Sequence, residues 1–182
     1  MKKLLFIYGL IGLTALSCSK DEVPEEINEE ELITTVEVAL SSAEGNVTLA
    51  YRDLDADGPQ PPTISVSGPL KSGVRYVGAI TFLNESESPA EDITEEVKEE
   101  GLEHQFFYTI GTGLDVTTAY SNLDSEGNPL GTEFTLTAGA VSSGTLTFTL
   151  RHEPNKPNTG LSDADGETDI EVAFDIEVVE LG

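Results

Sequence analysis

The segment "TDIEVAFDIEVV", residues 168–179, decides the fold. Apolar side chains stand at every second position from Ile170 to Val178, and acidic side chains such as Glu171 and Glu177 stand between them. An alternation with a period of two places the apolar side chains on one face of a β-strand and the polar side chains on the other. The segment therefore predicts a strand that is buried on one face and exposed on the other.

The same alternation recurs along most of the chain, with Gly, Pro, Asn or Asp between the alternating segments: residues 33–40, 46–52, 74–83, 104–110, 132–138 and 145–152. The segment 74–83 is apolar on both faces, which predicts a central strand. About seven or eight such strands predict a mainly β protein, an antiparallel immunoglobulin-like β-sandwich. The prediction concerns architecture alone, because a chain with no Trp lacks the Cys…Trp…Cys signature of true immunoglobulin domains.

One short helix is expected near residues 89–100. Ser88 suits the N-cap, Pro89 suits the first turn, and Glu91 completes a capping box with Ser88. Gly101 suits the C-terminal cap. Only a narrow stripe of this segment is apolar, so we expect the helix to lie across an edge or one end of the sandwich.

Residues 1–17 are expected to form a signal peptide, because two lysines precede an apolar run that ends in small residues. The run is shorter than the roughly 20 apolar residues that a membrane span needs. Residues 15–18 resemble the lipobox of bacterial lipoproteins, in which the signal is cleaved before the Cys, and fatty acids such as palmitate then acylate it. Cys18 is thus the expected lipid anchor. The alternative, a secreted protein with one free thiol, is disfavoured in an oxidising compartment.

Residues 18–31 predict a flexible acidic tether, because they carry too few apolar groups to fold. Residues 32–182 are expected to form a single β-sandwich domain. Residues 19–22, Ser-Lys-Asp-Glu, resemble the export signal of surface lipoproteins in the Bacteroidota. The expected location is therefore the outer membrane, lipid-anchored and facing the cell surface, with the periplasmic face as the alternative.

The chain is strongly acidic. Its formal net charge is −25, and loss of Lys2 and Lys3 with the signal peptide changes this value to −27. Like charges repel, which argues against nucleic acid and anionic membrane surfaces as partners. The charge is compatible with cation binding, and equally with an acidic surface that only keeps an exported protein soluble.

The first candidate site is a calcium loop, Asp53, Asp55 and Asp57 followed by Gly58. Alternate carboxylates before a Gly match the first half of an EF-hand loop. The twelfth position is Ile64 instead of Glu, so the loop predicts at most a reduced calcium site between strands. Asp and Gly are also ordinary turn residues, and this alternative stays open.

A related Asp-Ala-Asp-Gly sequence lies at residues 163–166, where Asp163, Asp165 and Asp169 predict a similar calcium cluster.

The second candidate site is a transition-metal or haem site at His104 and His152, the only two histidines of the chain. His104 begins one predicted strand and His152 ends another, and each side chain is expected on the same face as the apolar residues of its strand. Each His stands next to a glutamate, Glu103 or Glu153. If the two strands are neighbours, two imidazoles and a carboxylate can bind zinc, copper or a haem iron. The alternative is that each His is a strand-end residue with a satisfied hydrogen bond.

Motifs of common enzyme classes are absent from the sequence, including the G-x-S-x-G elbow, H-E-x-x-H and the P-loop. An acylated Cys18 cannot act as a nucleophile. We therefore expect a protein that is not an enzyme.

Several segments together resemble a family of small surface lipoproteins from Flavobacteria and other Bacteroidota: CSKDE at 18–22, YRDLDADG at 51–58, and residues 83–108, 144–157 and 166–178. Members often carry the label "type 1 periplasmic binding fold superfamily protein". A protein of that fold has two α/β lobes, whereas this sequence alternates as β throughout. The resemblance implies a gene beside a TonB-dependent outer-membrane receptor and an accessory role in nutrient uptake.

Two functions are therefore expected from the sequence. The first is a non-enzymatic outer-membrane surface lipoprotein that binds a ligand or metal for uptake with a TonB-dependent receptor. The second is a structural or adhesive surface module whose acidic loops are stiffened by calcium. The expected cofactor is accordingly calcium or a transition metal, and the expected attachment to the membrane is through the lipid anchor.

Overall fold

A computed structural model of the protein describes residues 32–55 and 58–182. The predicted signal peptide, the lipidation of Cys18 and the acidic tether lie outside these ranges, as does Asp57. No helix in the two described ranges is long and apolar enough to span a membrane.

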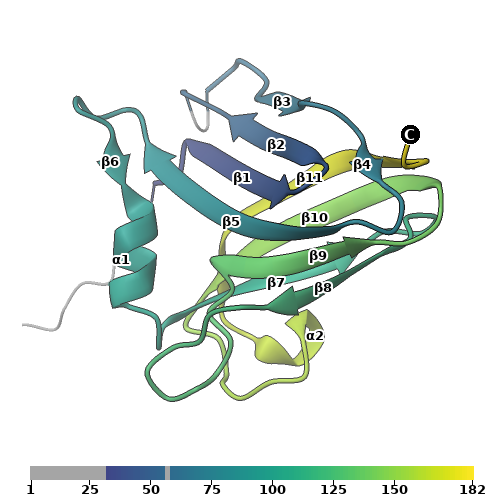
Figure 1. Ribbon diagram of the computed structural model, residues 1–182. Coiled ribbons are helices and arrows are strands. Elements are labelled where there is room, and N and C mark those ends of the chain that lie inside the picture. The colour runs from purple at the N-terminus through teal and green to yellow at the C-terminus, as the bar shows by residue number, and fades with distance from the viewer. Residues whose placement is uncertain (1–31, 56–57) are drawn as a thin grey trace, which may run out of the picture.

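Two β-sheets pack face to face in the described part of the chain (Figure 1). The larger sheet has the strand order β3-β2-β1-β5-β9-β8, with β6 paired to β5, and the smaller sheet has the order β4-β11-β10-β7. The elements are β1 Thr35–Ser42, β2 Gly45–Arg52, β3 Thr63–Val66, β4 Leu70–Lys71, β5 Arg75–Asn84, β6 Glu91–Asp92, α1 Ile93–Glu99, β7 His104–Ile110, β8 Val116–Tyr120, β9 Glu133–Ala138, β10 Ser142–His152, α2 Leu161–Ala164 and β11 Glu167–Val179. The mainly β, two-sheet sandwich predicted from the alternation is confirmed.

The core lies between the two sheets and contains the apolar face of β11, as its alternation predicted. Six aromatic side chains are almost fully buried there: Tyr76, Phe82, Phe106, Phe134, Phe148 and Phe174. The rings of Phe134 and Phe148, one from each sheet, meet at a centroid distance of 5.8 Å. This interlocking of large rings fixes how the strands of one sheet stand over those of the other.

Strand β5 lies between β1 and β9, so the prediction of a central strand is right, but only one of its faces is buried. Val77 on the other face is 62% exposed.

Four short strands were not predicted from the sequence: β3, β4, β6 and β8. They have two to five residues each, at or below the short end of the length over which an alternation can be recognised.

Helix α1 is present but begins later than predicted, at Ile93. Asp92 is the N-cap, and its carboxylate accepts a hydrogen bond of 3.0 Å from the backbone N–H of Thr94. The predicted cap at Ser88 is wrong, because the following residues turn back and pair β6 with β5. The helix lies at one end of the sandwich, as expected (Figure 1).

The loop from β10 to β11, residues 153–166, folds over the outer face of β7, and we call it the strap. Gln105 and Phe107 point away from the core, yet they are only 1% and 3% exposed. Asn158 of the strap donates a hydrogen bond of 2.8 Å to the side-chain oxygen of Gln105. Ala164 in α2 is fully buried. The strap thus ties the end of β10 to β7, next to the two histidines.

Candidate metal centre

His104 and His152 lie directly opposite each other on neighbouring antiparallel strands. His104 is the first residue of β7, His152 is the last residue of β10, and the two are register partners. Their rings stack with centroids 4.8 Å apart and an interplanar angle of 15°. The predicted transition-metal site depends on these two strands being neighbours. The structure meets this condition.

Asp169 joins the two histidines because of a β-bulge in β11. Leu150 pairs with Ile170 whereas Arg151 pairs with Thr168, so Asp169 is an extra residue in its strand. A bulge redirects the side chain of the extra residue and is common beside functional sites. In a regular strand Asp169 would share the outward parity of Glu171. With the bulge, its side chain is 0% exposed and lies beside the imidazoles.

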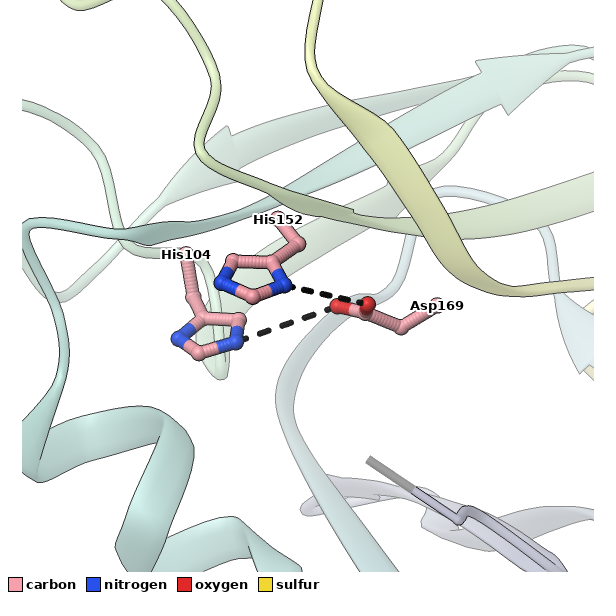
Figure 2. A group of neighbouring side chains, drawn as sticks. All are labelled: His104, His152 and Asp169. Atoms are coloured by element: carbon pink, nitrogen blue, oxygen red, sulfur yellow. Dashed lines mark ion pairs between the residues drawn. The ribbon is translucent and has the colours of Figure 1, made fainter. Parts of the chain in front are cut away.

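Figure 2 shows both rings turned toward the Asp169 carboxylate. The Nε2 atom of His104 lies 3.8 Å from Asp169 Oδ2, and the Nδ1 atom of His152 lies 3.8 Å from Asp169 Oδ1. The side chains of His104 and His152 are 1% and 7% exposed. These distances exceed those of direct hydrogen bonds, which are about 2.7–3.2 Å. The three side chains thus lie close together and buried at one end of the smaller sheet.

The tautomer of His104 is fixed by its backbone surroundings. Its Nδ1 atom lies 3.3 Å from the carbonyl oxygen of Glu100 at the end of α1. Burial lowers the pKa of His104 to about 4, so the imidazole is neutral at neutral pH. A neutral ring that donates from Nδ1 presents a lone pair at Nε2. That atom is buried and makes no hydrogen bond within the described part of the chain.

This is the arrangement that metal-ligating histidines adopt, in which one ring nitrogen donates to a carbonyl and the other faces the ion. Zinc binds nitrogen and carboxylate oxygen tetrahedrally at about 2.0–2.2 Å, so the ligand atoms of one ion lie roughly 3.5 Å apart. The ligand atoms of His104, His152 and Asp169 all lie within 4.8 Å of one another. They can hold one ion after drawing together by about 1 Å. The near-complete burial of the three side chains favours a bare ion over a haem.

A second group of potential ligands shares His152. Its other members are Glu103 and Glu153, both exposed, and the ligand atoms of the three residues also lie within 4.8 Å of one another. The backbone N–H of Glu153 donates to the carbonyl oxygen of Glu103 at 2.6 Å, which holds the two residues side by side. The predicted histidine and glutamate ligands are therefore close together, but they form two overlapping groups instead of one.

Asp53 and Asp55, the described residues of the predicted Asp53 loop, line one shallow pocket and make local hydrogen bonds. Asp53 accepts a hydrogen bond from the Tyr51 hydroxyl, and Asp55 accepts one from the backbone N–H of Gln60. Asp57 lies outside the described residues, so the predicted Asp53 loop stays a prediction.

The Asp163 carboxylate accepts hydrogen bonds from the backbone N–H and the hydroxyl of Thr159, which hold its pKa below the usual range. Asp165 is exposed. Within residues 32–55 and 58–182, Asp169 groups with the histidines and with neither of these two aspartates.

Lys156 and Asp124 support the centre and were not predicted. The Lys156 ammonium donates to the carbonyl oxygens of His104 and Gly101, at 2.6 Å each, and to the Asp124 carboxylate at 3.1 Å. The side chains of Lys156 and Asp124 are 6% and 0% exposed. A single Lys in a loop and a single Asp in a turn carry no sequence signal for such a contact, because only the fold brings residues 32 positions apart together.

Comparisons with protein-family models, with curated proteins and with solved structures find no match for this chain.

Proposed function

We propose that the protein is a non-enzymatic surface lipoprotein of the outer membrane that binds a divalent transition-metal ion. The ion is held by His104, His152 and Asp169, and the protein serves as an accessory metal-binding module for uptake with a TonB-dependent receptor. One observation carries the metal proposal: the ligand atoms of two register-paired histidines and of a carboxylate turned inward by a β-bulge lie within 4.8 Å of one another. The membrane location and the receptor rest on the N-terminal sequence and on the family resemblance.

The ligand types select the class of ion. Imidazole nitrogen suits zinc, copper, iron and nickel, whereas calcium takes six to eight oxygen ligands. The centre offers two imidazoles and a single carboxylate. It therefore supports a transition metal over calcium, with zinc as the simplest probe because it needs no change of oxidation state.

The burial of the proposed ligands favours a site that holds a metal ion over a site that uses the ion in catalysis. A catalytic metal keeps an open coordination position that a substrate can reach. Here the side chains of His104 and Asp169 are 1% and 0% exposed, and the His104 ring is further enclosed by the end of α1. An ion in this place is shielded from large substrates, as suits a protein that captures a metal and carries it.

Thermal unfolding of the purified protein tests the proposal. Measurements are made in EDTA and then with zinc, copper, cobalt or calcium in turn. A bound ion at about a hundredfold over its dissociation constant stabilises the folded state by roughly 2.7 kcal/mol. We expect zinc, copper or cobalt to raise the unfolding midpoint of the wild-type protein and calcium to leave it nearly unchanged.

The variant Asp169→Asn removes one ligand while keeping the size of the side chain, and we expect it to lose most of the shift with zinc. Asp175→Asn is the matched control, because it changes an exposed carboxylate of the same strand. A shift with calcium alone would favour the calcium-stiffened surface module. Equal zinc shifts in the two variants would exclude the proposed centre.

A further inference from the structure

His152 belongs to two groups of potential metal ligands. With His104 and Asp169 it forms the inner group, which is buried. With Glu103 and Glu153 it forms the outer group, in which both carboxylates are exposed. The outer group is therefore open to solvent, whereas the side chains of the inner group are buried. One imidazole joins the two.

A neutral imidazole has a single nitrogen lone pair, because its other nitrogen carries the proton. His152 can consequently bind one ion at a time, either with the outer carboxylates or with His104 and Asp169. Because both groups need the His152 ring, they are occupied one at a time. An ion that leaves the outer group for the inner group keeps the same imidazole within reach throughout the transfer.

We propose that Glu103, Glu153 and His152 form an outer metal position that captures a divalent ion from solvent and passes it to the inner centre. This inference rests on the proposed function of the inner centre and adds the route by which the ion arrives. Exposed carboxylates exchange water readily and attract cations, whereas the inner ligands are almost inaccessible to solvent. The outer position accelerates loading, and the inner position supplies most of the affinity.

The first test is the rate of zinc association in the double variant Glu103→Gln/Glu153→Gln. Zinc is released from a chromophoric chelator in a stopped-flow experiment, and its uptake by the protein is followed. We expect association to slow by about tenfold. The matched control is Glu37→Gln/Glu133→Gln, which removes two exposed carboxylates from the larger sheet and lowers the net negative charge equally. We expect the control to associate at nearly the wild-type rate.

The second test isolates the outer position at equilibrium. In Asp169→Asn the inner group is impaired, and we expect weak zinc binding to persist through the outer group. Adding Glu103→Gln and Glu153→Gln to that variant is expected to abolish the remaining binding. Circular dichroism of each variant verifies that it is folded before zinc is added.

The outcomes separate the two proposals. A wild-type protein that binds no zinc overturns the inner centre and the transfer route together. A wild-type protein that binds zinc through Asp169, while Glu103→Gln/Glu153→Gln associates as fast as the control, overturns only the route. The route is equally overturned if the glutamate substitutions leave zinc binding by Asp169→Asn unchanged.

Discussion

Lys156 is the residue that fastens the strap beside the proposed metal centre. Its ammonium donates to two backbone carbonyls, one of them that of His104, and forms a buried ion pair with Asp124. A buried charge is tolerated only when it is paired and hydrogen-bonded. Loss of the ammonium would leave the Asp124 carboxylate in a place where water cannot replace it.

We therefore expect Lys156→Met to lower the free energy of unfolding by about 3–5 kcal/mol at neutral pH. Denaturant unfolding followed by circular dichroism measures the loss. The double variant Lys156→Met/Asp124→Asn leaves no buried charge behind and is expected to be more stable than Lys156→Met alone. A single variant as stable as the wild type would show that the ion pair does not contribute to the fold.

The same ion pair makes the stability of the folded state depend on pH. Burial acts to raise the pKa of Asp124, but the N–H groups of Asn128 and Glu126 and the Lys156 ammonium outweigh it and hold the pKa below its ordinary value of 3.8. The folded state then binds fewer protons than the unfolded state below about pH 4, so stability falls there as pH falls. The double variant is expected to lose less stability than the wild type between pH 4 and pH 2.

Asp169 shows where inference from the sequence stops at the scale of single residues. Strand parity places His104 and His152 on one face correctly, because both strands are regular up to the histidines. The same parity places Asp169 outward, with Glu171. The bulge reverses this orientation, and it depends on pairing with β10, which the sequence of β11 alone does not contain. The sequence therefore predicts the two histidines of the proposed site and misses its carboxylate.

At the scale of elements, helix α1 supplies the backbone carbonyl that orients the His104 ring. The helix is held by the Asp92 cap and by Thr94, whose hydroxyl accepts a hydrogen bond of 2.9 Å from the backbone N–H of Phe82 in β5. Its own Ile93 and Val97 side chains are buried against the core. A disturbance of the first turn would thus loosen the contact between the end of α1 and His104.

We expect Asp92→Ala to lower the free energy of unfolding by about 1 kcal/mol, the usual loss for an N-cap. Ser88→Ala is the matched control, because Ser88 is the cap that the capping-box pattern predicts and the structure does not use. Chemical denaturation of both variants decides between the two caps. A larger loss for Ser88→Ala than for Asp92→Ala would contradict the observed start of the helix.

The long strands could be predicted because each buries one face, and burial imposes a period of two on the sequence. β7 coincides with its predicted bounds, and β11 differs by one residue. The strap and the short edge strands could not be predicted, because contacts with distant segments determine them. The Gln105–Asn158 hydrogen bonds, for example, join residues 53 positions apart.

At the scale of the whole molecule, the proposed metal centre lies at one end of the smaller sheet. β7, β10 and β11 each supply one of its three proposed ligands, and the strap connects β10 to β11 at this end. An ion bound there would crosslink three strands of the smaller sheet at the C-terminal end of β10. This crosslink would add to the apolar core, which joins the two sheets. The formal net charge of −25 favours the approach of cations to the whole surface.

The most direct test of the central claim is anomalous X-ray diffraction at the zinc edge, from crystals of the purified protein soaked with zinc. The expected result is one strong peak about 2.0–2.2 Å from a ring nitrogen of His104, a ring nitrogen of His152 and an oxygen of Asp169. A peak confined to the Asp53–Asp55 loop or to surface carboxylates, or the absence of any peak near the two histidines, would contradict the proposed centre.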